Sequence, residues 1–238
     1  MVEEKGKIQL EERVKRDTYG GTRIKYPGET VAEVREKLQQ LGIQVIFQKI
    51  SKFYKVDFPI YLVRAIDKEN KLFSKGMGKG LTEEYAKASG LMELVERYSA
   101  ANYREENIVK VSFNDVRDKA LDPLRLLYSS DTSYHHDKEI DFTFGYSLTH
   151  QKEVLIPATF SYYVYNCKMM DGKITNIRDN IKTIVPSNGL ASGNCIEEAI
   201  LHGMFELVER DAVFIMWLNK LNMPVVDVSA VENKYIRG

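Results

Sequence analysis

The hydrophobic residues of this chain first gather in short runs typical of β-strands. Residues 43–50 and 59–66 are rich in β-branched and aromatic side chains, which predicts two strands. The link over 52–58 is too short for a helical crossover, so we expect these strands to pair antiparallel.

A second group of apolar runs lies in the middle of the chain. Residues 141–146 and 154–165 again have the composition of strands, and the polar residues 149–152 between them predict a hairpin. Residues 174–185 show no clear period and are expected to be irregular, whereas 224–228 begin another predicted strand.

Helical periodicity predicts three helices. One begins at Thr30 as its N-cap, with Glu33 completing a capping box, and ends before Gly42. The other two extend over about 82–103 and 196–218. Helices and antiparallel strands together indicate an α+β fold.

The two long predicted helices contain a repeated segment. Residues 90–97 read GLMELVER and residues 203–210 read GMFELVER, at an offset of 113 residues. The same offset relates three earlier pairs: Gly80 and Gly193, Glu84 and Glu197, Ala86 and Ala199. Such near-identity within one chain predicts that both helices perform the same task.

The repeat carries Glu93 and Glu96 in its first copy and Glu206 and Glu209 in its second. Glutamates at i and i+3 project from one face of a helix. If the two helices meet, four carboxylates converge, and their repulsion must be neutralised by a cation. Oxygen ligands of this kind suit Mg²⁺, above all beside a phosphate.

Other readings of these glutamates remain open. Glu93 with Arg97, and Glu206 with Arg210, are i,i+4 pairs that also occur as exposed salt bridges. A four-helix di-iron site would need Glu-x-x-His on two helices, and here the i+3 residue is glutamate both times.

Composition excludes several function classes. Lys and Arg number 34, as do Asp and Glu, so no net field favours nucleic acid or an anionic membrane. No apolar run approaches the roughly 18 residues of a membrane span, and the charged N-terminus lacks a signal sequence, so we expect a cytoplasmic protein. Cys167 and Cys195 are too few for a zinc site, and His135 and His136 are expected in a loop.

The glycine-rich segment 76–80 is expected to be a loop that leads into the first repeated helix. Its spacing fits neither the P-loop pattern nor the dinucleotide-binding pattern, so it is weak support for phosphate binding.

The chain resembles the YcaO family. The similar segments are Gly78-Lys79-Gly80 through Ser89-x-x-x-Glu93-x-x-Glu96-Arg97, Asn188 to Asn194 through Glu206-x-x-Glu209-Arg210-Asp211, and Gly21-Thr22-Arg23 with Pro27-Gly28-Glu29-Thr30. The resemblance implies antiparallel and mixed sheets with two duplicated helices enclosing an ATP and Mg²⁺ site. It also implies a domain over 21–238, cut short at its C-terminal end relative to the family. Residues 1–20 are charged and weakly periodic, which predicts an N-terminal arm before this domain.

The resemblance also implies site residues. Glu93, Glu96, Glu206 and Glu209 would hold Mg²⁺, whereas the implied nucleotide contacts are Arg23, Thr30, Ser89, Asn194 and Arg210. For Thr30, a helix cap, a nucleotide contact or both remain open. No catalytic side chain is assigned.

Proteins of this family use ATP to phosphorylate a peptide-backbone amide oxygen, so a peptide or protein substrate is implied. We expect thioamide formation with sulfide, helped by a TfuA-like sulfur-delivery partner; a homodimer is also compatible. The alternatives are an azoline-forming cyclodehydratase and a non-catalytic nucleotide-binding scaffold. Cys195 is expected to be structural, although a helix N-terminus can lower a thiol pKa.

Overall fold

A computed structural model describes residues 8–16, 22–54, 57–69, 72–126, 134–163, 165, 167–170, 173–176, 187–229 and 232. Its first layer is an antiparallel sheet in the order β1-β2-β3, as predicted for its first two strands. The bounds are β1 Gln44–Lys49, β2 Ile60–Ile66 and β3 Leu72–Lys79. The one-turn helix α2 Ser51–Tyr54 lies between β1 and β2.

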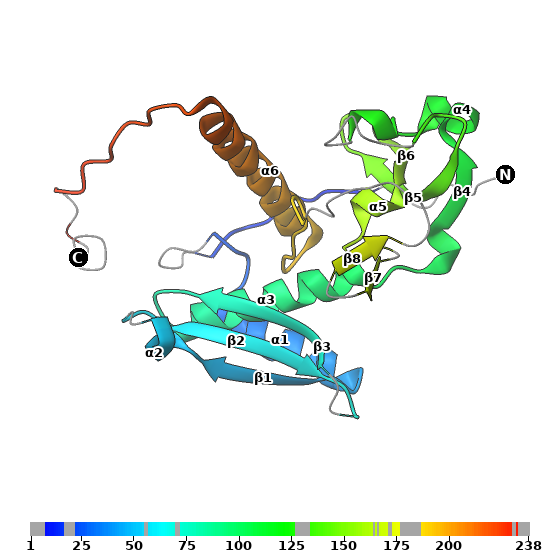
Figure 1. The fold of residues 1–238 in the computed structure, drawn as a ribbon. Coiled ribbons are helices and arrows are strands. Elements are labelled where there is room, and N and C mark those ends of the chain that lie inside the picture. The colour runs from blue at the N-terminus through cyan, green and yellow to red at the C-terminus, as the bar shows by residue number, and fades with distance from the viewer. Residues whose placement is uncertain are drawn as a thin grey trace.

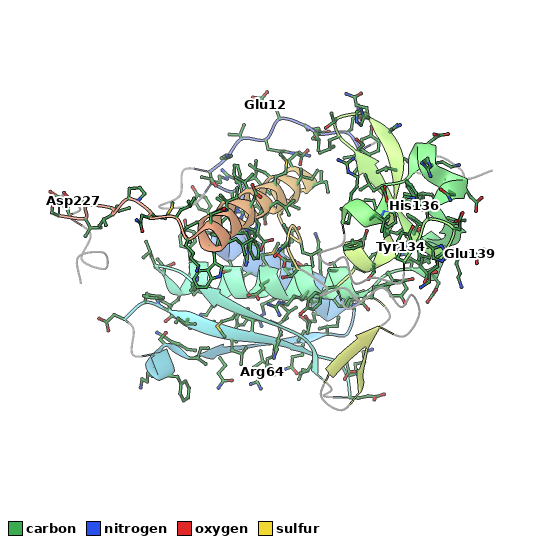
Figure 2. All side chains as sticks on the ribbon, turned by 45° about the horizontal axis from the view of Figure 1, so that its top comes forward. Glu12, Arg64, Tyr134, His136, Glu139 and Asp227 are labelled. Carbon is green, nitrogen blue, oxygen red and sulfur yellow. The ribbon has the colours of Figure 1, made fainter. Side chains whose placement is uncertain are left out.

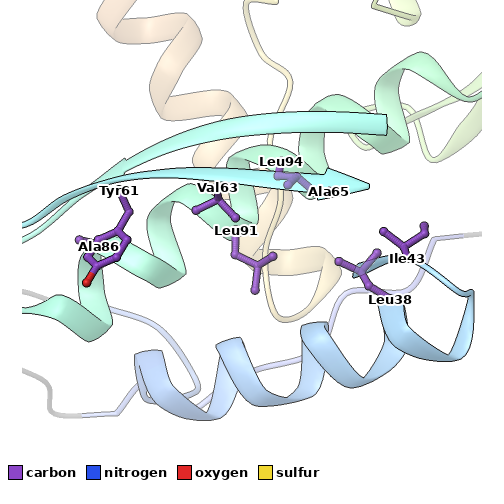
Figure 3. Packing of buried hydrophobic residues seen from close by; sticks show 8 residues of the cluster. All are labelled: Leu38, Ile43, Tyr61, Val63, Ala65, Ala86, Leu91 and Leu94. Carbon is purple, nitrogen blue, oxygen red and sulfur yellow. The ribbon is translucent and has the colours of Figure 1, made fainter. Parts of the chain in front are cut away.

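Two helices, α1 Pro27–Gln40 and α3 Glu83–Ala101, pack on this sheet. Alternate residues of β2, among them Val63 and Ala65, are fully buried because they point toward the helices (Figure 3). They meet Leu91 and Leu94 of α3 and Leu38 of α1 in one apolar cluster.

Helix α1 begins one turn earlier than predicted. Tyr26 is its N-cap, Pro27 takes the first helical position, and the Glu29 carboxylate accepts a hydrogen bond from the Tyr26 N–H at 2.7 Å. Thr30 is therefore inside the helix and buried, and its predicted role as a cap is wrong. Gly42 follows the helix with φ +76°, which confirms it as the terminator.

The glycine-rich segment was predicted to be a loop, and this prediction is wrong. Residues 76–79 instead form the end of strand β3. A Cβ atom on Gly78 would lie 1.9 Å from the Ala86 carbonyl oxygen and 2.1 Å from the Gly90 nitrogen. These glycines serve close contact between a strand and a helix, rather than a free turn.

The second sheet has the order β4-β5-β6, with β4 Ile108–Ser112, β5 Glu139–Ser147 and β6 Lys152–Pro157. The predicted hairpin is confirmed as β5 and β6. Its second strand was predicted to reach residue 165 but ends at Pro157, where helix α5 Ala158–Ser161 begins. Short helices complete this part: α4 Phe113–Val116, η1 Glu105–Asn107, η2 Arg117–Lys119 and η3 Pro123–Arg125.

His136 lies between these elements, in a turn before β5 (Figure 2). Its Nε2 is 2.8 Å from Asp122 Oδ1, and its ring packs against Phe113. The loop prediction for the histidine pair is confirmed.

A small hairpin, β7 Cys167–Met170 and β8 Lys173–Asn176, precedes the second long helix. Residues 174–176, predicted to be irregular, thus lie in a strand; 177–185 lie outside the described residues. Helix α6 Ile196–Asn219 matches its prediction closely and ends at Lys220 in the left-handed conformation. Residues 224–228 form no strand, since no described strand pairs with them.

Both long predicted helices are confirmed, and so is the α+β class with antiparallel sheets. In the described part of the chain, no helix combines the length and apolar character that crossing a membrane requires. The division into an arm over 1–20 and a domain over 21–238 stays a prediction.

Candidate active site

The duplicated helices bring carboxylates together. Helix α6 lies beside α3 (Figure 1 and Figure 2), and Glu96 lies close enough to Glu206 and Glu93 for their charges to act on it. Burial, then the charge of Glu206, then that of Glu93 raise the pKa of Glu96 to about 7. Three of the four predicted carboxylates therefore gather, whereas Glu209 is exposed on α6.

The first glutamate of each repeated segment is held in the same way. Glu93 Oε2 accepts a hydrogen bond from the Met77 N–H of β3 at 2.9 Å, and Glu93 Oε1 lies 2.6 Å from Arg97. Glu206 Oε2 accepts one from the Gly189 N–H at 2.8 Å, and Glu206 Oε1 lies 3.2 Å from Arg210. The sequence repeat is thus a structural repeat, in which a backbone amide and an arginine orient each carboxylate.

A glycine contact accompanies each copy. Gly90 of α3 packs against Gly78, and Gly203 of α6 packs against the Gly189 carbonyl, 2.6 Å from where a Cβ would stand. Gly189 itself has φ +82°, which favours glycine. The close approach brings the Met77 and Gly189 amides within reach of the two glutamates.

Residues 187–194 form the loop before α6, and this loop contacts α3. The Ser192 hydroxyl donates to the Met92 carbonyl at 2.8 Å. At the end of the loop, Asn194 Oδ1 accepts a hydrogen bond from the Thr30 hydroxyl at 2.8 Å. Thr30 and Asn194, two predicted nucleotide contacts, are therefore direct neighbours.

Glu198 joins this group to the N-terminal segment. It is 8% exposed, and its carboxylate accepts hydrogen bonds from the Ile24 N–H at 2.6 Å and from the Asn194 N–H at 2.9 Å. Arg23 Nη1 lies 3.8 Å from the same carboxylate. Arg23, Thr30 and Asn194 thus meet around a buried acid that the sequence analysis missed.

The signal for Glu198 was its position as the third residue of α6, where an acid favours the helix N-terminus. Of the remaining predicted contacts, Ser89 is exposed on α3 one turn before Glu93, and Arg210 is half-exposed beside Glu206. The predicted nucleotide contacts thus fall into two groups. Arg23, Thr30 and Asn194 lie together, whereas Ser89 and Arg210 lie nearer the repeated glutamates.

The donor set suits a hard divalent cation, although no three acidic, histidine or cysteine side chains of the described residues stand close enough to hold one as arranged. Glu93 and Glu206 are engaged by their arginines. The pKa of Glu96 shows that Glu93 and Glu206 are near enough for their charges to act on it.

Two cavities adjoin the site. One of about 260 Å³ is lined by Glu96, Ser99, Ala100, Ser161, Tyr162, Leu190 and Ala191. The other, of about 230 Å³, lies at the start of α6, and Arg23, Ile24 and Glu198 are among its lining residues.

Cys195 is the N-cap of α6 and lines the second cavity. Burial is the main reason that its thiol pKa is raised, in spite of the helix N-terminus. This favours the inert thiol over a reactive thiolate.

Known proteins resemble the chain over most of its length. An uncharacterized protein of Methanothermobacter thermautotrophicus is 32% identical over 212 residues, 89% of this chain and 52% of that protein. One from Mycobacterium tuberculosis is 23% identical over 92% of this chain and 48% of that protein. The chain thus spans about half the length of these relatives.

Solved structures share the fold. A heterocyclase in complex with substrate and cofactor has a TM-score of 0.75 and 28% identity, over 98% of this chain and 33% of that chain. The YcaO protein of Methanopyrus kandleri bound with AMPPCP and Mg²⁺ has a TM-score of 0.61 and 23% identity, over 89% of this chain and 50% of that chain.

Residues 77–238 match the family described as YcaO cyclodehydratase, ATP- and Mg²⁺-binding. This range contains both duplicated helices, the Met77 and Gly189 amides and all four repeated glutamates. It covers more than half of the chain, and the family's ATP and Mg²⁺ are the cofactors that the sequence predicted. The chain belongs to the YcaO family.

Proposed function

We propose that this chain forms the nucleotide-binding part of an ATP- and Mg²⁺-dependent enzyme that activates a peptide-backbone amide. The supporting observation is the meeting of Glu96 and Glu206 between two duplicated helices. Like charges at a half-buried point are costly unless a cation or a proton neutralises them. A duplicated acidic pair is therefore better explained by metal binding than by salt bridges.

The proposed ligands of Mg²⁺ are Glu93, Glu96, Glu206 and Glu209. Their carboxylate oxygens fit the ion. The Met77 and Gly189 amides occupy one oxygen of Glu93 and one of Glu206, and the second oxygen of each lies beside an arginine. Arg97 and Arg210 would then exchange these oxygens for phosphate, to which an arginine can donate two parallel hydrogen bonds. The proposed nucleotide contacts are Arg23, Thr30, Ser89, Asn194 and Arg210.

ATP supplies a phosphoryl group that turns the amide oxygen into a leaving group. A bare amide oxygen leaves poorly, so this activation is what an incoming nucleophile needs. The chain's own contribution would be positioning and charge neutralisation. Arg210, which lies beside Glu206, would neutralise developing phosphate charge, and the Thr30–Asn194 pair would hold the opposite end of the nucleotide.

The preferred product is a thioamide, formed when sulfide adds to the activated carbon and phosphate departs with the original oxygen. A TfuA-like protein would deliver the sulfide. The heterocyclase in complex with substrate and cofactor supports a peptide substrate and also keeps azoline formation as the second candidate.

Mass spectrometry separates these outcomes. Synthetic peptides with Gly-Cys, Gly-Ser and Gly-Ala steps would be incubated with the full-length protein, ATP, Mg²⁺ and sulfide. Exchange of one oxygen for sulfur, including in the Gly-Ala peptide, supports thioamidation. Loss of water from the Cys or Ser peptides without sulfide indicates azolines. Unchanged peptides despite Mg²⁺-dependent nucleotide binding would indicate a scaffold.

A further inference from the structure

The cavity of about 260 Å³ shares Glu96 with the proposed metal ligands, but its other lining residues take no part in the metal or nucleotide contacts described above. We propose that it holds the acceptor, a neutral stretch of peptide backbone whose amide oxygen is presented to the phosphate. The proposal rests on the function proposed above and adds to it the position from which the substrate enters.

The order of residues along α3 gives the first argument. Ser89, a proposed nucleotide contact, comes first, Glu93 and Glu96 follow, and Ser99 and Ala100 of the cavity come last. Glu96 itself lines the cavity, and with a rise of about 1.5 Å per residue the wall continues to Ser99, about 4.5 Å farther along the helix axis. The carboxylates therefore stand between the nucleotide end and the cavity.

The loop before α6 also runs from the cavity to the proposed nucleotide contacts, in the direction opposite to α3. Asn194 bonds to Thr30, Ser192 bonds to the Met92 carbonyl at the middle of α3, and Leu190 and Ala191 line the cavity. The start of α1 lies near the beginning of α3, where Gly28 approaches Glu84. Two independent segments thus place the Thr30–Asn194 pair and the cavity at opposite ends of the carboxylates.

This arrangement suits in-line phosphoryl transfer, in which the acceptor enters opposite the leaving group. With the nucleoside end of ATP toward Asn194, the γ-phosphate lies at the carboxylates and its free side faces the cavity. The amide oxygen forms a bond to the γ-phosphorus while the bond to the β,γ-bridging oxygen breaks. ADP leaves with that electron pair, and the amide N–H proton passes to water.

The walls of the cavity fit a neutral peptide better than a phosphate. Ala100, Leu190 and Ala191 supply apolar surface, and within the described residues no lysine or arginine lines it. Uncharged polar groups come from Ser99, Ser161 and Tyr162, which suit hydrogen bonds to an amide, and the Glu96 carboxylate lines the cavity beside them.

Tyr162 is held in place on the side of the second sheet. Its hydroxyl is 2.9 Å from Thr143 Oγ1, and its ring packs 5.3 Å from that of Tyr103. The next residue, Tyr163, donates its N–H to the Ala100 carbonyl at 2.9 Å. The cavity is thus formed jointly by α3, α5 and the loop before α6, three elements that meet on the C-terminal side of α3 (Figure 1).

A cavity-filling pair of variants tests the proposal. Ser99→Phe places a ring in the cavity mouth, and Ala101→Phe places one on the exposed side of the same helix as a matched control. The probe is the peptide acetyl-Gly-Cys-Gly-N-methylamide, followed by saturation-transfer NMR with AMPPCP and Mg²⁺ present; calorimetry measures AMPPCP affinity. We expect Ser99→Phe to weaken peptide binding by about tenfold or more. AMPPCP affinity should change less than about twofold in either variant.

Loss of AMPPCP affinity in Ser99→Phe with an unchanged peptide signal would overturn the proposal and assign the cavity to the nucleotide. So would a wild-type protein that binds AMPPCP with Mg²⁺ but gives no peptide signal. A wild-type protein that binds the peptide in this cavity, yet binds no AMPPCP, would contradict the proposed function while leaving the peptide site standing.

Discussion

Glu96 of α3 and Glu206 of α6, one from each duplicated helix, lie close enough for the charge of Glu206 to raise the pKa of Glu96. Without a cation, this contact opposes folding at neutral pH. The chemistry of the site depends on what neutralises these charges.

The first prediction concerns pH and stability without Mg²⁺. The folded pKa of Glu96, about 7, exceeds its reference value of 4.5, so between these values the folded state binds the proton more tightly. The folding stability that this proton contributes is fully present below about pH 4.5 and is lost as the pH rises through about 7. The melting temperature, followed by circular dichroism, should therefore fall less between pH 5.5 and 8 in Glu96→Gln than in wild type. Equal falls would show that Glu96 does not titrate in this range.

The second prediction separates the duplicated acids from ordinary helix glutamates. Glu206→Gln removes one charge and little volume, and should weaken Mg²⁺-dependent AMPPCP binding about tenfold or more. Glu36→Gln on exposed α1 is the control and should have no effect. Glu83 is a poorer control, because it bonds to Lys49 at 2.5 Å and to the Tyr61 hydroxyl. Similar losses in Glu206→Gln and Glu36→Gln would remove α6 from the site.

The third prediction concerns the contact between β3 and α3. Gly78→Ala would place a methyl group 1.9 Å from the Ala86 carbonyl oxygen, and forcing helix and strand apart should cost about 3 kcal/mol. Gly28→Ala on α1 meets its nearest atom at 3.9 Å and should be neutral or slightly stabilising. Urea unfolding measures both, and a Gly78→Ala protein of wild-type stability would contradict the packing described here.

The fourth prediction concerns Cys195. Its raised thiol pKa argues against a thiolate that carries sulfur. Cys195→Ser should therefore retain thioamide formation when free sulfide is supplied, as seen by mass spectrometry of the peptide product. Complete loss of product with AMPPCP binding intact would make Cys195 the sulfur relay.

The sequence predicted best what depends on local and repeated patterns. Both long helices were expected within two residues or so at their ends, because their apolar spacing and flanking residues act locally. The carboxylate cluster was expected because two copies of one segment, at an offset of 113 residues, together indicate a contact that neither copy indicates by itself.

What the sequence did not predict depends on distant partners. Residues 76–79 form a strand because β2 pairs with them and because α3 packs so closely on Gly76 and Gly78 that no side chain fits there. Glu198 was missed since its partners, Ile24 and Arg23, lie some 174 residues away in the chain. The cavity beside Glu96 combines α3, α5 and a loop, so no single stretch reveals it.

The central claim is that the facing carboxylates hold the nucleotide through a divalent cation. Calorimetric titration of AMPPCP into the full-length protein, with Mg²⁺ and then with a chelator, tests it most directly. We predict that binding occurs with Mg²⁺ and is lost without it, because the carboxylates repel a bare triphosphate. Equal affinity under both conditions would contradict the account.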